Sequence, residues 1–208
     1  MNHDTIGVKL FLKYASVAPC LKPETFDMTK MAGEQSIDGR LPEITDHLKK
    51  LTPYPHLEAI AKLMGIDDPL DNRVVSSYWI GNPRLSAEHI HNSTTLIPAL
   101  NQDPAVAARM KDNCLIHPGN VIAVNGDILT VSYNPLTFGE EKCSMELGAP
   151  QTILVKNEFV SPDDIKPNIF IAFHYLRAIE KISPQQYADL QQLTIEALKR
   201  LSSLCRTF

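Results

Sequence analysis

Two pairs of cysteine and histidine residues in this 208-residue chain have types and a spacing that suit metal or thiol chemistry. Cys114 and His117 form a Cys-x-x-His pair, and His89 and His91 form a His-x-His pair. Thiolate and imidazole are both metal ligands, but two donors are too few for a metal site. His89 and His91 would face the same side on a strand and diverge by about 160° on a helix, which the preceding segment 86–88 favours. Each pair therefore needs further residues, which the fold must bring to it.

Packing in the protein core is the alternative explanation for a cysteine in this chain. A free cysteine is most often a small buried apolar residue, and we expect this packing role for Cys20, Cys143 and Cys205. The four cysteines lie far apart and include no C-x-x-C pair. This pattern indicates a reduced cytoplasmic protein with free thiols rather than a disulfide scaffold.

Composition argues against several classes of function. With 44% apolar and 21% charged residues, the chain has enough material for one large or two small cored domains. Its 20 basic and 24 acidic residues give a formal charge of -4, which is not the footprint of a nucleic-acid-binding protein. Neither the phosphate-binding glycine motifs nor a Gly-x-Ser-x-Gly elbow occurs. Charges interrupt the first 20 residues and no long apolar run follows, so we expect neither a signal peptide nor a membrane span.

Before residue 113 the spacing of apolar residues is helical. A first helix is expected to end at Pro19 and to have an apolar face made of Ile6, Leu10, Phe11 and Tyr14. The segment 25–52 looks polar and irregular, and helices are expected at 42–51, 55–64, 69–80 and 105–111. Gly65 suits a left-handed helix end, and Asp68 followed by proline suits a helix start. We expect Trp79, in the helix at 69–80, to be buried.

After residue 113 the pattern changes to that of short strands. Asn125-Gly126 separates two alternating segments, which is the strongest short-range indication of a β-hairpin. Further strands are expected at 152–155 and 169–174. Ser183 and Gln186 form a capping box, so a final helix is expected to begin there. The sequence thus predicts an α+β protein, with strands and one helix in its C-terminal part.

The segment Cys114–Asp127 resembles the opening of the HypC/HupF family, small chaperones of [NiFe]-hydrogenase maturation. In that family a cysteine is followed, after three residues, by Pro-Gly and then by strand, turn and strand, and Pro118-Gly119 keeps this spacing. Downstream, 165–174 resembles the family's last strand with its histidine, and 178–182 resembles the lead-in to its final helix. The two likenesses occur in the family's order. They imply a helical domain at 1–112 followed by a HypC-like, OB-like β barrel with a C-terminal helix at 113–208.

The resemblance also implies a function. Members of the family are thought to carry iron that bears cyanide and carbon monoxide from a scaffold protein to the hydrogenase large subunit. Cysteine sulfur suits such soft iron, and a histidine can orient a ligand or exchange a proton. Our candidate metal or ligand residues are therefore Cys114, His174 and His117, with His89 and His91 as weaker ones, and our candidate partner-binding residues are Pro118 and Gly119. Because the first and last strands of a closed barrel are neighbours, we expect Cys114 and His174 to lie close enough to share a ligand.

Three hypotheses follow. The first is a cytoplasmic, non-enzymatic accessory protein that binds a hydrogenase precursor or a maturation scaffold protein. A resemblance of 65–71 and 73–82 to an uncharacterised family from hydrogenase gene neighbourhoods agrees with it. The second is a metal- or thiol-dependent enzyme in which Cys114, His117 and His174 converge with His89 and His91. The third is an adaptor that has no ligand role.

Overall fold

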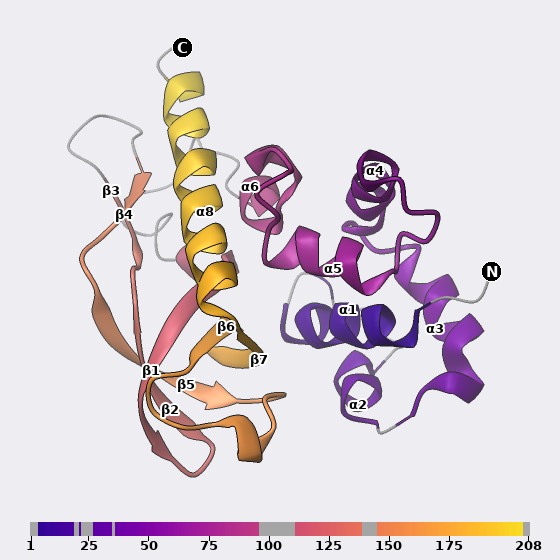
Figure 1. Cartoon of the computed structure of the whole chain (residues 1–208), viewed down its shortest axis with the longest axis horizontal. Helices are drawn as coiled ribbons and strands as arrows, with labels where there is room; N and C mark the ends of the chain where they lie inside the picture. The colour runs from indigo at the N-terminus through magenta and orange to yellow at the C-terminus, as the bar shows by residue number, and fades with distance from the viewer. Residues whose placement is uncertain are drawn as a thin grey trace.

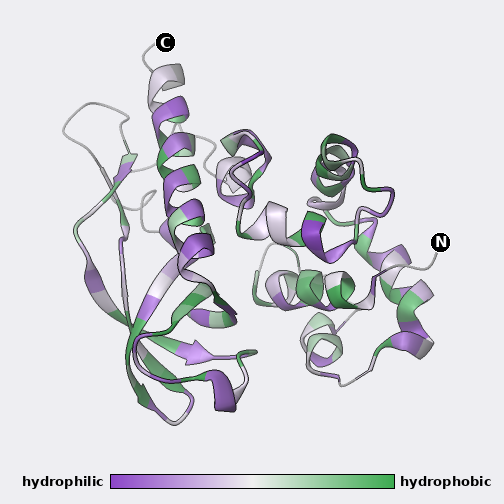
Figure 2. Ribbon diagram, in the orientation of Figure 1, coloured by the Kyte–Doolittle hydropathy of each residue, from purple (hydrophilic) through white to green (hydrophobic). Residues whose placement is uncertain are grey.

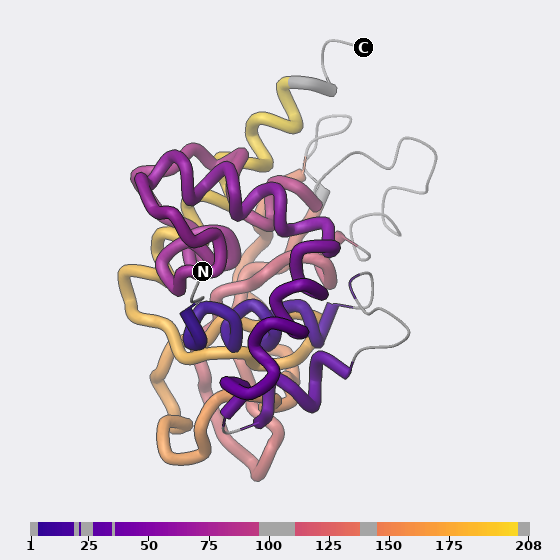
Figure 3. Tube along the Cα trace, turned by 90° about the vertical axis from the view of Figure 1, so that its right-hand side faces the viewer, coloured from indigo at the N-terminus to yellow at the C-terminus, as the bar shows by residue number. Residues whose placement is uncertain are grey.

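The computed structural model describes residues 4–18, 21, 27–34, 36–95, 111–138 and 145–205. Helices of the first half lie to one side of a closed β barrel, and a long C-terminal helix stands beside the barrel strands (Figure 1). Seen from the helical side, the N-terminal helices lie in front of the strands (Figure 3). The predicted α+β class, with a barrel and a final helix, is confirmed.

Six α-helices and two short 3-10 helices have assigned bounds among the described residues up to residue 95, and residues 111–114 are helical as well. The α-helices are α1 (Thr5–Val17), α2 (Met28–Gly33), α3 (Leu41–Leu48), α4 (Tyr54–Met64), α5 (Asn72–Trp79) and α6 (His91–Thr95). The 3-10 helices are η2 (Asp38–Arg40) and η3 (Ala87–His89). Helix α4 ends at Gly65, whose φ of 66° is left-handed as predicted. The predicted helix at 105–111 lies outside the described residues except for its last position.

Three expectations about this half were wrong. Ile6 does not share the buried face of α1, because 67% of its surface is exposed. The segment expected to be irregular contains α2, which buries Met28, Met31 and Ala32. The helix expected from residue 69 begins at Asn72, because Asp71 is the residue whose carboxylate accepts from a first-turn amide. The Asp68 carboxylate accepts from Leu70 N instead, at 3.0 Å, and so closes the preceding turn.

The barrel has five strands in the order β1-β2-β5-β7-β6, closed by pairing of β6 with β1. Their bounds are β1 (His117–Asn125), β2 (Ile128–Tyr133), β5 (Gln151–Asn157), β6 (Phe170–His174) and β7 (Arg177–Ile182), and β3 (Leu136–Phe138) pairs with β4 (Met145–Leu147) outside the barrel. The β1–β2 hairpin turns at Gly126, with a φ of 58°, as predicted. Residues 178–182 lead into the final helix, as expected, but they also form a strand that was not expected: they lie in β7, which pairs parallel to β5 and antiparallel to β6.

The interior of the barrel explains a glycine near the start of β1. Val131 and Phe173 are buried in the barrel core, and a Cβ built on Gly119 would lie 2.3 Å from Val131 Cγ1 and 3.0 Å from Phe173 Cε1. Only glycine fits at this position without movement of the core. Pro118 and Gly119, predicted to bind a partner, are both buried.

Helix α8 (Pro184–Cys205) begins with the predicted capping box. The amide of Gln186 donates to Ser183 Oγ at 3.1 Å, and the amide of Ser183 donates to Gln186 Oε1 at 2.9 Å. Apolar and polar residues alternate along α8 (Figure 2), and Leu193, Ala197 and Leu198 are buried on its apolar side. The helix thereby covers β3, β4 and the segment that leads into β1.

The helical part and the barrel share one apolar core. The largest cluster of buried residues combines α1, α4 and α5 with Ile116, Ala172 and Ile179. Trp79 is fully buried in it, as predicted, and stacks on the Tyr14 ring at 4.9 Å. The Tyr14 hydroxyl donates to Glu180 Oε1 of β7 at 2.6 Å. A domain boundary at residues 112–113 remains a prediction.

The contact between Tyr14 and Glu180 gives a first testable expectation. Burial raises the pKa of Glu180, although hydrogen bonding to Tyr14 and the charge of Lys13 act in the other direction. Because the pKa of Glu180 is raised in the folded protein, this carboxyl stabilises the folded state most when the pH is below its ordinary pKa of 4.5. The stabilisation decreases as the pH rises through the folded-state pKa.

Glu180→Gln is therefore expected to raise the free energy of unfolding at pH 8 relative to the wild type, and this gain should vanish below about pH 4.5. Tyr14→Phe leaves the carboxylate buried without its donor and should cost about 1–3 kcal/mol at pH 8. Urea unfolding at both pH values measures the two effects. A Glu180→Gln protein that is less stable than Tyr14→Phe at pH 8 would contradict this account.

Candidate functional site

Cys114 lies at the edge of a cavity of about 240 Å³ between the helical part and the barrel. Residues 111–114 are helical and lead through Leu115 and Ile116 into β1. Both of these residues are buried, which anchors the segment. The cavity is lined by residues from α6, the 111–114 segment and the end of β6: His91, Thr94, Thr95, Lys111, Cys114, His174 and Tyr175. Cys114 itself is half-buried and is a free cysteine.

Two imidazoles meet at the backbone carbonyl of Cys114. His91 Nε2 lies 3.2 Å and His174 Nε2 lies 3.1 Å from this oxygen. A carbonyl only accepts hydrogen bonds, so each Nε2 carries the proton and each Nδ1 presents a lone pair. The Nδ1 of His91 lies 3.3 Å from the Tyr78 hydroxyl, whereas the Nδ1 of His174 is buried and makes no hydrogen bond within the described structure.

Both imidazoles are neutral at physiological pH. Burial lowers the pKa of His91 to about 4, although its hydrogen bond to Cys114 opposes this effect. Burial also lowers the pKa of His174 well below its ordinary range, and the neighbouring His91 and His117 add to that shift. Neutral imidazole is the form that binds metal or accepts a proton. Of the two Nδ1 lone pairs, the one of His174 is not engaged by any described residue.

The thiol of Cys114 is held by a residue in a two-residue turn between β6 and β7. The Tyr175 hydroxyl lies 2.8 Å from Cys114 Sγ. Tyr175 and Leu176 have φ values of 48° and 60°, and His174 pairs with Arg177 across the turn. Positive φ at both central positions is the pattern of a type I′ turn, which usually contains asparagine or glycine. Bulky residues in this conformation are strained, and such strain concentrates at functional positions.

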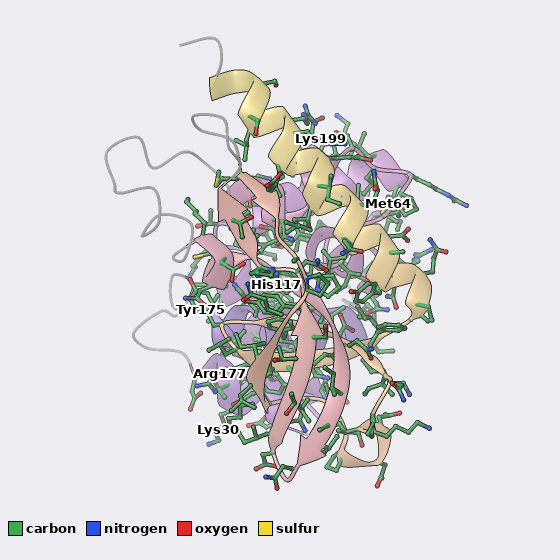
Figure 4. The ribbon with its side chains drawn as sticks, turned by 90° about the vertical axis from the view of Figure 1, so that its left-hand side faces the viewer. Lys30, Met64, His117, Tyr175, Arg177 and Lys199 are labelled. Atoms are coloured by element: carbon green, nitrogen blue, oxygen red, sulfur yellow. The ribbon has the colours of Figure 1, made fainter. Side chains whose placement is uncertain are left out.

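His117 does not join this cavity, which corrects the expected Cys-x-x-His pair. Its Nε2 lies 2.8 Å from the Asp112 carbonyl and 3.2 Å from Asp112 Oδ1, and its ring stacks on Phe173. His117 lies near the middle of the molecule, whereas Tyr175 lies towards its edge (Figure 4). The Asp112 carboxylate also accepts from the Tyr133 hydroxyl at 3.2 Å and from Leu136 N at 2.6 Å. His117 therefore fastens the Cys114 segment to the barrel.

The weaker pair, His89 and His91, separates although it does not lie on one helix: His89 ends η3, His91 begins α6, and Ile90 between them is extended. His91 lines the cavity, but His89 lies 3.7 Å from Glu88, outside it. The convergence of His89 and His117 on Cys114, which the enzyme hypothesis requires, does not occur. Among the described residues, no group of three or more histidine, cysteine or acidic side chains is close enough to hold a metal ion. Cys20 and Cys143, and the side chain of Cys205, lie outside the described residues.

Two residues of the cavity had no indication in the sequence. Tyr175 follows the predicted strand, but Tyr-Leu is not a sequence typical of a tight turn. Lys111 lines the cavity and its Nζ donates to the Thr95 carbonyl at 2.7 Å, a contact across 16 positions.

Comparison with known proteins gives one family. The sequence model described as "Family of unknown function (DUF6390)" matches residues 4–102 and 93–207. No match was found among curated proteins or solved structures. None of the helices in the described parts of the chain has the length and apolar character needed to cross a membrane. Because the two matches together extend over both halves of the molecule, the chain belongs to the family of unknown function DUF6390.

Proposed function

We propose that this chain is a cytoplasmic, non-enzymatic accessory protein of [NiFe]-hydrogenase maturation, in which Cys114 Sγ holds an iron unit with cyanide and carbon monoxide ligands as cargo. One observation carries the proposal. Cys114 and His174, the two residues through which the chain resembles the HypC/HupF family, are 60 positions apart and line one cavity. The proposed partners are a hydrogenase large-subunit precursor or a maturation scaffold protein.

The size and chemistry of the cavity support this cargo. A cavity of about 150 Å³ is large enough for a benzene molecule, so about 240 Å³ leaves room for iron with three diatomic ligands. Such a unit brings several ligands of its own, so that it needs few donors from the protein. Cys114 Sγ supplies a soft donor, and His174 Nδ1 supplies a neutral lone pair.

Lys111 adds charge complementarity. Its ammonium group lies in the wall of the cavity, beside Thr95. Cyanide ligands bring negative charge, and an ammonium group donates charge-assisted hydrogen bonds to such acceptors. The Tyr175 hydroxyl is a further donor beside the sulfur atom.

Comparison of the two imidazoles tests the role of His174. His174→Gln keeps an amide N–H that can donate to the Cys114 carbonyl but removes the free Nδ1 lone pair, so cargo transfer should fall roughly tenfold or more. His91→Gln is the matched control, because the Nδ1 of His91 already faces the Tyr78 hydroxyl. Transfer of labelled iron to the hydrogenase precursor measures both. Equal losses in the two variants would mean that His174 acts only in packing.

Association with hydrogenase proteins tests the proposal itself. A tagged form of the chain, expressed with the hydrogenase and maturation proteins of its own genome, is expected to retain the large-subunit precursor or a scaffold protein. A tagged, unrelated protein of similar charge serves as the control. A genome that encodes this chain and no [NiFe]-hydrogenase would overturn the assignment and leave an adaptor role.

A further inference from the structure

A second, larger cavity of about 610 Å³ lies in the helical part, away from the Cys114 site. Its walls come from η2, α3, the start of α4 and the turn that precedes α5. This volume lies within the range of about 300–1,000 Å³ that is typical of small-molecule sites. The apolar part of the wall is formed by Leu41, Pro42, Tyr54 and Pro69.

The charged side chains around this cavity are predominantly acidic. Asp38, Asp46, Glu58 and Asp67 line it, against one lysine, Lys49, which pairs with Asp46 at 3.4 Å. Glu58 and Asp67 are exposed and form no hydrogen bond or ion pair with the described residues. The cavity therefore has an excess of negative charge that the described structure does not neutralise.

One buried hydroxyl group in the wall also lacks a partner. Thr45 is 1% exposed, and its Oγ1 makes no hydrogen bond in the described structure. Buried polar atoms are usually paired, so this oxygen points to an absent hydrogen-bonding ligand. Tyr54 adds a phenol ring and its hydroxyl to the wall. Burial, together with Glu58 and Asp68, raises the pKa of Tyr54, so this hydroxyl is neutral at physiological pH.

The arrangement of the carboxylates selects the class of ligand. A metal ion needs donors that converge on one point, and no such group of three exists among the described residues. The acidic groups instead share the wall of the cavity with apolar side chains. A flexible molecule with ammonium groups separated by methylene segments matches both features, because its charges meet the carboxylates and its methylenes contact Leu41 and the prolines.

We propose that the cavity between α3 and α4 is a binding site for a small aliphatic polyamine, a molecule of the spermidine type. Glu58 and Asp67 bind its ammonium groups, and the Tyr54 hydroxyl accepts a hydrogen bond from one of them. The site is independent of the Cys114 cavity.

Calorimetric titration of the full chain with spermidine at low ionic strength tests the proposal. We expect saturable binding of one molecule per chain. The double variant Glu58→Gln, Asp67→Asn should bind at least about tenfold more weakly, because two charge-assisted contacts are lost. Tyr54→Phe keeps the ring and should weaken binding by roughly threefold to tenfold.

The matched control is the double variant Glu146→Gln, Asp163→Asn, which makes the same change in net charge at exposed positions outside the cavity. It should bind spermidine as the wild type does. Absence of saturable binding to the wild type, or equal weakening in the two double variants, would overturn the proposal. Binding of a tetralysine peptide that depends on Glu58 and Asp67, without binding of spermidine, would assign the cavity to a basic protein partner and would also overturn it.

Discussion

Cys114→Ser is expected to abolish iron loading while leaving the fold intact. Serine preserves the shape of the side chain but replaces a soft sulfur donor by a hard oxygen donor, which low-valent iron binds poorly. The side chain is half-buried, and its one hydrogen-bonding contact with the described residues is with Tyr175, so the free energy of unfolding should change by less than about 1 kcal/mol. Iron content per chain after co-expression with maturation proteins, and urea unfolding, measure the two expectations.

Tyr175→Phe is the control for this substitution. It removes the hydroxyl beside the sulfur atom but keeps the thiol, so most of the iron should remain bound. If Cys114→Ser binds as much iron as the wild type, the sulfur atom is not the ligand. If Tyr175→Phe loses iron to the same extent as Cys114→Ser, positioning of the thiol rather than its softness determines loading.

Asp112→Ala is expected to have the largest effect on stability. The Asp112 carboxylate accepts hydrogen bonds from Leu136 N and the Tyr133 hydroxyl and contacts His117, and it thereby ties the Cys114 segment to the barrel. Hydrogen bonds to a charged group contribute about 1.5–3 kcal/mol each, and their donors would be left unpaired. We expect a loss of about 3–5 kcal/mol in urea unfolding. Asp163→Ala, at an exposed position in the 3-10 helix 162–164, should stay within about 0.5 kcal/mol of the wild type.

The contribution of Asp112 to the free energy of unfolding should depend on pH. Burial alone would raise the pKa of Asp112, but hydrogen bonding to His117, Leu136 N and Tyr133 outweighs it, so the pKa is lowered in the folded protein. A lowered folded-state pKa means that the stabilisation is present above the ordinary value of 3.8 and is lost as the pH falls through the folded-state pKa. The difference between wild type and Asp112→Asn should therefore shrink below about pH 4. A difference that is constant from pH 7 to strongly acidic conditions would contradict this assignment.

Elements specified by neighbouring residues were predictable from the sequence. The hairpin at Asn125-Gly126 and the capping box at Ser183 depend on interactions within a few positions, and both occur as expected. Strand β7 was missed for two reasons. Its turn with β6 contains Tyr175 and Leu176 instead of asparagine or glycine, and its other partner, β5, is distant in the sequence, with Lys156 paired to Arg177. The start of α5 was misplaced because two aspartates, Asp68 and Asp71, both suit a helix cap, and only their folded contacts distinguish them.

The candidate site was predictable in part for the same reason. Barrel closure does bring Cys114 and His174 to one cavity, but through pairing of β1 with β6, which is the penultimate barrel strand rather than the last. His91 reaches the cavity because α6 packs against the 111–114 segment and the barrel, a contact that no local pattern encodes. Tyr175 depends on a strained turn whose residues are atypical of turns. Closure of the barrel could be inferred from local patterns, whereas the packing of helices on it could not.

The infrared spectrum of the chain, purified after co-expression with its maturation partners, tests the central claim most directly. Coordinated cyanide and carbon monoxide have stretching bands in a region that is free of protein absorption. Our account predicts these bands in the wild-type protein and their absence from Cys114→Ser at the same protein concentration. Absence of the bands from the wild type, or bands of equal intensity in both proteins, would contradict it.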